Sequence, residues 1–186
     1  MDQLVKSGLI TKLDRNYSLT TDGLALADRV SHSDMTVRKQ PHIVTTISVV
    51  NDVGQTILFR HAFQPYLGRA GFPQGRMHYG EDIAQAAQRE LFEKTGLQNV
   101  DLIHRGIAYI RTTKDGVDLS KIFAHVFSGQ VVGAPELVTN DPRKGTSAWG
   151  DADALVQDQQ MPGFARVREL LASQKELFFA EIEALM

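Results

Sequence analysis

The sequence predicts an α/β fold preceded by a small segment made of a helix, a hairpin and a second helix. Three observations lead to this prediction. A glycine-rich loop runs into an amphipathic helical pattern over residues 75–97. Runs rich in Ile, Val and Thr lie on both sides of it, within 42–60 and 100–132. Residues 1–30 alternate short helical and extended patterns around turn residues.

Length and composition set the bounds of the prediction. The chain has 186 residues, a formal net charge of −2 and 42% hydrophobic residues, which suits one ordinary domain with an appendage. The absence of cysteine excludes disulfides, thiol nucleophiles and cysteine zinc sites. The near-neutral charge gives no general attraction to nucleic acid or anionic lipid. No apolar run approaches the roughly 20 residues of a membrane span, so we expect a cytoplasmic protein.

The N-terminal segment, residues 1–38, resembles the closing half of a winged-helix domain together with a linker. Gly8 can end a first helix, residues 14–16 form a turn between two short strands, and Thr20 or Thr21 can cap a helix that reaches about residue 30. The segment could bind DNA, join subunits or serve only for packing. DNA binding needs a recognition helix and a basic face, which this stretch lacks, so packing or a homodimer contact is favoured.

The remaining chain, residues 39–186, predicts one domain in which strands surround the central helix. Its expected elements are strands at 42–50 and 56–60, a loop at 61–73, strands at 100–113 and 117–132, a loop at 133–147, a short helix from about 151 and a terminal helix from 164 to the end. In the terminal helix, Val167, Leu170, Phe178 and Ile182 are expected on one apolar side.

The central stretch combines features of a helix start, an apolar stripe and a helix end. Glu81 and Asp82 stand where a helix N-terminus favours negative charge, and Gly96 is placed to cap the C-terminus. An apolar stripe is expected from Ala84, Ala87 and Leu91, at three- and four-residue spacing. Glu90 and Glu93 are three residues apart, so they project from a neighbouring face of the same helix.

This stretch resembles the signature of the Nudix hydrolases. The residues that match are Gly75, Glu81, Arg89, Glu90, Leu91, Glu93, Gly96 and Leu97. One position departs from the pattern, because Lys94 stands where the family has the last glutamate of a pair. The lead-in, residues 72–75, and the upstream Arg60 also resemble the family. The resemblance implies an α/β/α sandwich with a mixed sheet, and hydrolysis of a diphosphate linkage in a nucleoside diphosphate derivative.

The resemblance also implies roles for individual residues. Glu90 and Glu93 would bind Mg²⁺ or Mn²⁺ with the carbonyl of Gln74, because these hard cations prefer oxygen ligands. Glu81 would anchor the helix start or join the metal ligands. The base would be Glu90, Glu93 or an acid of a later loop, and the candidates there are Glu136 and Asp141.

Three arginines and a glycine complete the predicted site. Arg89 can pair with Glu93 along the helix, and the resemblance gives it an orienting role. The candidates for substrate binding are Arg60, Gly75 and Arg76.

Lys94 decides between the functional hypotheses. It follows Glu90 by four residues, so the two are expected to pair. A lysine in place of the glutamate also removes one negative ligand from the site and adds one positive charge. The chain is then a hydrolase that works with fewer metal ions, or a catalytically weakened protein that binds a nucleotide-like ligand. A third possibility is a scaffold that keeps the motif for packing alone.

Overall fold

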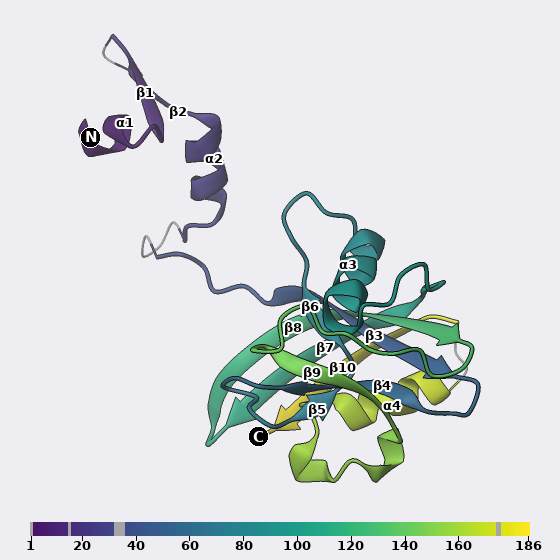
Figure 1. Cartoon of the computed structure of the whole chain (residues 1–186). Helices are drawn as coiled ribbons and strands as arrows, with labels where there is room; N and C mark the ends of the chain where they lie inside the picture. The colour runs from purple at the N-terminus through teal and green to yellow at the C-terminus, as the bar shows by residue number, and fades with distance from the viewer. Residues whose placement is uncertain (1, 15, 32–35, 174–175) are drawn as a thin grey trace. The chain divides into compact units, whose positions relative to one another are not determined.

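The computed structural model describes residues 2–14, 16–31, 36–173 and 176–186, and it divides the chain into two compact units. The first unit comprises residues 1–40 and the second residues 41–186, and both are drawn in Figure 1. Within the described residues, no helix has the length and apolar character needed to cross a membrane. Part of the predicted linker, residues 32–35, lies outside the described residues.

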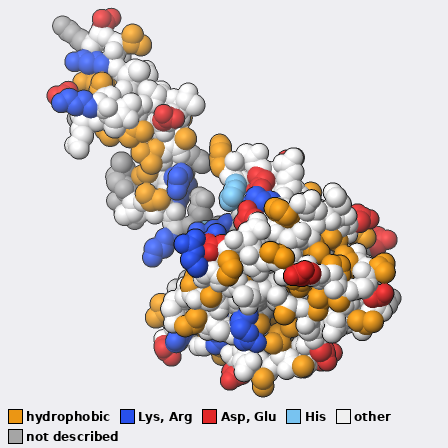
Figure 2. Space-filling model, in the orientation of Figure 1, with side chains coloured by type: hydrophobic (Ala, Val, Ile, Leu, Met, Phe, Trp, Pro, Cys, Tyr) orange, Lys and Arg blue, Asp and Glu red, His pale blue; other side chains and the backbone are white. Residues whose placement is uncertain are grey.

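The N-terminal unit has the predicted order of helix, hairpin and helix. Its elements are α1 (Asp2–Lys6), β1 (Ile10–Leu13), β2 (Asn16–Leu19) and α2 (Thr21–Asp28). Thr20 caps α2, because its hydroxyl accepts a hydrogen bond from the Gly23 amide at 3.1 Å. Ile10 is the one buried hydrophobic residue of this unit's described part, and Figure 2 shows apolar side chains on its surface. The unit therefore encloses little apolar core of its own.

The second unit is built on a mixed sheet in which β3 (His42–Asn51) is central. β3 runs parallel to β8 (Val117–Val131) and antiparallel to β4 (Thr56–His61) and β6 (Gln74–Arg76). The main path of the sheet has the order β10-β7-β8-β3-β4-β5. The remaining strands are β5 (Ala70–Gly71), β7 (Ile103–Lys114), β9 (Gly145–Gly150) and β10 (Phe178–Leu185). The mixed sheet predicted for this domain is confirmed.

Helices cover both faces of this sheet (Figure 1). Ile47 and Val49 point to one face, where they pack with Ala87 and Leu91 of α3 (Ile83–Thr95). Val44 points to the other face, where the core includes Val167 and other residues of α4 (Phe164–Ala172). Because side chains alternate along a strand, β3 supplies both cores and holds α3 in a fixed position.

The predicted terminal helix is wrong beyond residue 172. α4 ends at Ala172, and after residues 174–175, which are not described, the chain forms β10, an edge strand parallel to β7. Phe178 and Ile182 are buried while their neighbours Phe179 and Glu181 are exposed. This alternation has the period of a strand, and pairing with β7 outweighs the helical propensity of the segment.

Two other predictions need correction. Residues 145–150, expected in a loop that leads to a helix, form strand β9, which pairs antiparallel with β4. Short 3-10 turns follow, at Ala152–Ala154 and Gln157–Gln159. Ala84, expected in the apolar stripe of α3, is exposed, and Ala86 is buried instead. The buried side of α3 also carries Glu90 and Thr95.

Candidate active site

Helix α3 begins and ends where the sequence predicts. Asp82 is the N-cap, and its amide donates to Oε1 of Gln85 at 3.3 Å, as in a capping box. Gly96 forms the C-cap with a φ of 75°, a left-handed conformation that glycine adopts without a steric penalty. Both ends of the helix are thus stabilised locally, and the carboxylates between them have defined positions.

Gly75 lies directly against the carboxylate of Glu90. A Cβ atom built on Gly75 would lie 1.8 Å from Cδ of Glu90 and 2.0 Å from each carboxylate oxygen. Glu90 is 6% exposed, so it is not the solvated surface residue that a pair of helical glutamates usually represents. β6 holds Gly75 in place, because Gly75 is the antiparallel partner of Thr45 in β3. The backbone of residues 74–75 and the Glu90 carboxylate therefore share one small space.

Arg89 joins three carboxylates at this point. Its Nε lies 2.6 Å from Oε1 of Glu81, and its Nη1 lies 2.7 Å from Oε1 of Glu90 and 3.3 Å from Oε1 of Glu93. Its Nη2 donates to the carbonyl of Arg76 at 3.0 Å. The predicted pair of Arg89 and Glu93 is present, and both glutamates of the motif converge on one guanidinium.

Glu81 is fully engaged in hydrogen bonds. Arg89 donates to both of its oxygens, and the His78 amide donates to Oε2 at 2.9 Å. The bonds from Arg89, followed by the His78 amide, lower the pKa of Glu81 to about 2. The same contacts, led by the bond to Glu81, raise the pKa of Arg89. This geometry suits the anchoring role expected for Glu81 at the helix start.

Lys94 contacts the opposite side of Glu90. Its Nζ lies 3.6 Å from Oε2 of Glu90 and 4.4 Å from the ring centroid of Phe59. The Lys94 side chain is 14% exposed, so the ammonium is held between a carboxylate and an aromatic face. The predicted pair of Glu90 and Lys94 is thus formed, and each oxygen of Glu90 faces a cation.

These pairings limit the metal that the site can hold. In the part of the chain that the structure describes, no three His, Asp or Glu residues are grouped to hold a metal ion. Lys94 explains this, because it replaces a carboxylate by an ammonium. The Glu90 carboxylate, which lies against Gly75, and the 40% exposed side chain of Glu93 still offer oxygen ligands for a single hard cation.

His61 belongs to this site, although its spacing in the sequence gives no such signal. The residue is 8% exposed, and neither ring nitrogen has a hydrogen-bond partner. Its ring contacts Phe59, Phe63 and Tyr66 edge-on. Burial, and secondarily the charge of Lys94, lower the pKa of His61 to about 4. A neutral imidazole thus lies beside the cation that faces Glu90.

The other predicted residues make their contacts elsewhere. Arg60, on β4, donates to the Gly68 carbonyl at 2.6 Å. Asp141 is paired with Arg143 at 2.8 Å, and Glu136 is exposed. The loop that carries both acids is attached to α3, because the Asn140 amide donates to the Glu93 carbonyl at 2.9 Å. The structure brings Gly75, Glu81, Arg89, Glu90, Glu93 and the Arg76 carbonyl together.

The family model for the NUDIX domain matches residues 40–172, which include the whole glycine-rich loop and α3. The chain belongs to the NUDIX domain family. The Nudix resemblance of the motif is thereby confirmed.

Two curated relatives of this NUDIX domain are RNA pyrophosphohydrolases. The protein of Bartonella clarridgeiae is 29% identical over 102 residues, covering 48% of this chain and 57% of its own. The protein of Bartonella bacilliformis is 32% identical over 103 residues, covering 49% and 59%. The chain thus spans somewhat more than half the length of these relatives.

Solved structures show the same fold. The NUDIX domain of Shewanella oneidensis NrtR, complexed with ADP ribose, has a TM-score of 0.64 at 14% identity, covering 83% of this chain and 99% of its own. The MutT protein of Bacillus halodurans has a TM-score of 0.58 at 22% identity, covering 76% and 89%. At these identities the likeness concerns the fold, and it confirms the predicted fold class.

Proposed function

We propose that this NUDIX domain hydrolyses a diphosphate linkage in a nucleoside diphosphate derivative, with Mg²⁺ or Mn²⁺. The observation that carries the proposal is the contact of Gly75 with Glu90, beside the accessible carboxylate of Glu93. Packing alone does not require a carboxylate there, since a buried charge is costly and Glu90 needs two cations, Arg89 and Lys94, to offset it. The RNA pyrophosphohydrolases among the relatives support the same chemistry.

Each residue of the motif has its own role in the proposed reaction. Glu90, Glu93 and the carbonyl of Gln74 would hold one divalent ion, which when bound neutralises phosphate charge and acidifies a water. Glu93 is the more exposed of the two glutamates, so we assign it the removal of the proton from the attacking water. Arg89 orients both carboxylates, and Glu81 fixes Arg89.

The diphosphate itself requires positive charge and backbone donors. We assign Arg76 and the backbone at Gly75 to the substrate phosphates, because both lie on β6 next to α3. Arg60 of β4 is kept as a further candidate for the same phosphates. Glu136 and Asp141 remain the alternative bases, because their loop is bonded to the end of α3.

The test is a substrate panel with Mg²⁺ or Mn²⁺. The panel contains a 5′-triphosphorylated RNA, ADP ribose and nucleoside triphosphates. We expect turnover on at least one compound and a loss of roughly 100-fold or more in kcat for Glu93→Gln. Glu169→Gln is the matched control, since Glu169 is an exposed glutamate of α4 paired with Arg166. No turnover on any compound would remove the proposal.

A second candidate function is a NUDIX domain that binds a nucleotide-like ligand without cleaving it. The ion pair of Lys94 with Glu90 favours this candidate, because it places an ammonium where a hydrolase of the family would have a carboxylate. In that case nucleotides bind without metal and remain intact. Lys94→Glu then creates a Mn²⁺ site, detectable by electron paramagnetic resonance, and raises turnover. Strong turnover by the unmodified chain ends this alternative.

A further inference from the structure

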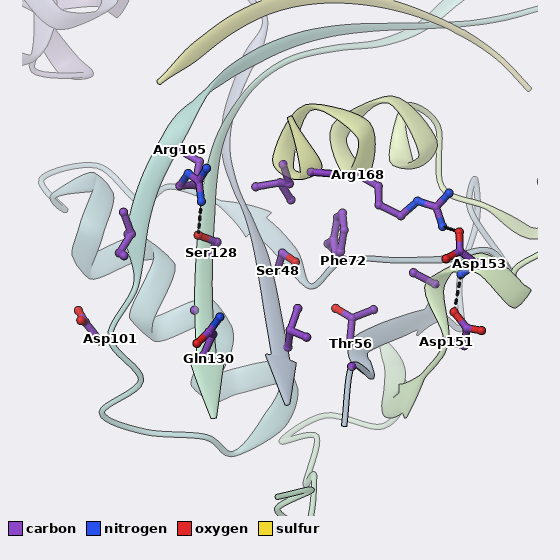
Figure 3. Close-up of a pocket in the computed structure, with 17 residues that line it drawn as sticks. Ser48, Thr56, Phe72, Asp101, Arg105, Ser128, Gln130, Asp151, Asp153 and Arg168 are labelled. Carbon is purple, nitrogen blue, oxygen red and sulfur yellow. Dashed lines mark hydrogen bonds and ion pairs between the residues drawn. The ribbon is translucent and has the colours of Figure 1, made fainter. Parts of the chain in front are cut away.

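A separate pocket of about 640 Å³ lies on the other face of the sheet (Figure 3). Its floor includes Ser48 and Val50 of β3, which point away from the face that carries Ile47, Val49 and α3. Leu171, at the C-terminal end of α4, forms part of its wall. None of the motif residues from Gly75 to Leu97 lines this pocket, so it is distinct from the candidate active site.

Small residues in the lining help to leave the pocket open. Six of its lining residues have a side chain no larger than that of serine, namely Ser48, Gly54, Ser128, Gly129, Ala152 and Ala172. Further along the same strands, Val44 and Val126 fill the corresponding layer with apolar core. A cavity left unfilled in a packed layer reduces stability, and its volume lies within the range of small-molecule sites.

Charged groups lie at the two ends of the pocket, with Phe72, Ser48 and Thr56 between them (Figure 3). At one end, Arg105 donates to the hydroxyl of Ser128 at 3.4 Å, and Gln130 and Asp101 lie further down the same side of the view. At the other end, Arg168 is paired with Asp153. The ring of Phe72 lies in the middle, packed on Phe164 with 4.7 Å between centroids. The middle therefore suits a flat group with polar edges.

The charged side chains at the two ends of the pocket indicate the net charge of the ligand that it would accept. Arg105 and Asp101 both line one end, and the other end is lined by the ion pair of Arg168 and Asp153 and by Asp151. A phosphate would meet a carboxylate at either end, and like charges repel in a partly enclosed site. Hydroxyl and amide groups both donate and accept, so they match ends that are lined by both guanidinium and carboxylate groups.

We propose that this pocket binds a nucleoside. A nucleoside has a flat base for the middle beside Phe72, ribose hydroxyls for one end and a polar base edge for the other, and it carries no phosphate. A free sugar lacks the flat part, and a nucleotide adds the charge that the carboxylates disfavour. The proposal does not depend on hydrolysis, because it concerns another face of the domain.

The test is calorimetric titration of the full chain with adenosine, guanosine, ribose and adenosine monophosphate. We expect saturable binding of a nucleoside, and weaker binding of ribose and of the monophosphate. Gln130→Ala removes one exposed polar group, and we expect nucleoside affinity to fall roughly fivefold. Ala172→Trp places an indole at the edge of the pocket, and we expect it to abolish binding.

The control distinguishes this pocket from the active site and from misfolding. Ala165→Trp adds the same indole to an exposed position of α4 that does not line the pocket, so binding is expected to persist. Glu93→Gln should also leave nucleoside binding unchanged. The proposal is overturned if no nucleoside binds, if the monophosphate binds more tightly, or if Ala172→Trp and Gln130→Ala bind like the unmodified chain.

Discussion

The contact between Gly75 and Glu90 gives a sharp prediction for Gly75→Ala. The new methyl carbon would lie 1.8 Å from Cδ of Glu90, whereas nonbonded carbon atoms rest about 3.5 Å apart. Either β6 or the carboxylate must therefore move by roughly 1.5–2 Å. Glu90 cannot easily yield, because it is buried and held by Arg89 at 2.7 Å and Lys94 at 3.6 Å.

The magnitude follows from this displacement. Overpacking of a rigid site typically costs about 1–3 kcal/mol, so the free energy of unfolding should fall by that amount. A misplacement of about 1 Å in a catalytic group can cost roughly 100-fold in rate, so kcat/KM should fall at least that far. Denaturant unfolding and steady-state kinetics on the best substrate of the panel measure the two effects.

Gly150→Ala is the matched control for this experiment. Its Cβ would meet the end of the flexible Leu58 side chain at 3.0 Å, away from the motif. We expect a loss below about 1 kcal/mol and unchanged kinetics. If Gly75→Ala retained both stability and kcat/KM, the close approach of the loop to Glu90 would not be the basis of the site.

Further predictions concern pH and packing. The pKa of His61 falls from 6.5 in the unfolded chain to about 4 in the fold. The free energy of unfolding should therefore fall by about 3 kcal/mol as the pH falls from 6.5 toward 4, because the unfolded chain binds the proton more readily. His61→Phe should flatten that part of the profile of stability against pH. Because the pKa of Glu81 is lowered to about 2, the stability lost in Arg89→Met should be largest above pH 4.5 and shrink as the pH falls toward 2, which acid titrations of both proteins test. Ile182→Ala should lower the free energy of unfolding by about 2–4 kcal/mol, against less than about 0.5 for the exposed Glu181→Ala; equal losses would contradict the edge strand.

Local patterns in the sequence were sufficient for the helix of the motif. The helix begins after Asp82 and ends at Gly96, as short local signals predict. Its ion pairs also join residues one turn apart, namely Arg89 with Glu93 and Glu90 with Lys94. The same holds for the hairpin between β7 and β8, where Asp115 and Gly116 have φ angles of 51° and 77°. Such features depend on short spacings and on the conformations of glycine and aspartate.

Local patterns failed where a distant strand decides the outcome. Residues 178–185 carry apolar residues at spacings that suit a helix, yet the hydrogen bonds offered by β7 make them a strand. His61 gave no signal, because its role arises from burial beside Phe59 and Lys94, and Lys94 is distant in sequence.

The sequence by itself thus determined the family, the helix that carries the acidic residues and the substitution of Lys94, since these depend on residue types at short, constant spacings. Only the tertiary structure decided that Glu90 is enclosed by Gly75, Arg89 and Lys94, and that Glu93 is the accessible carboxylate. The reason is physical: the exposure and charge environment of a side chain depend on what the sheet packs against it, and helical spacing does not contain that information.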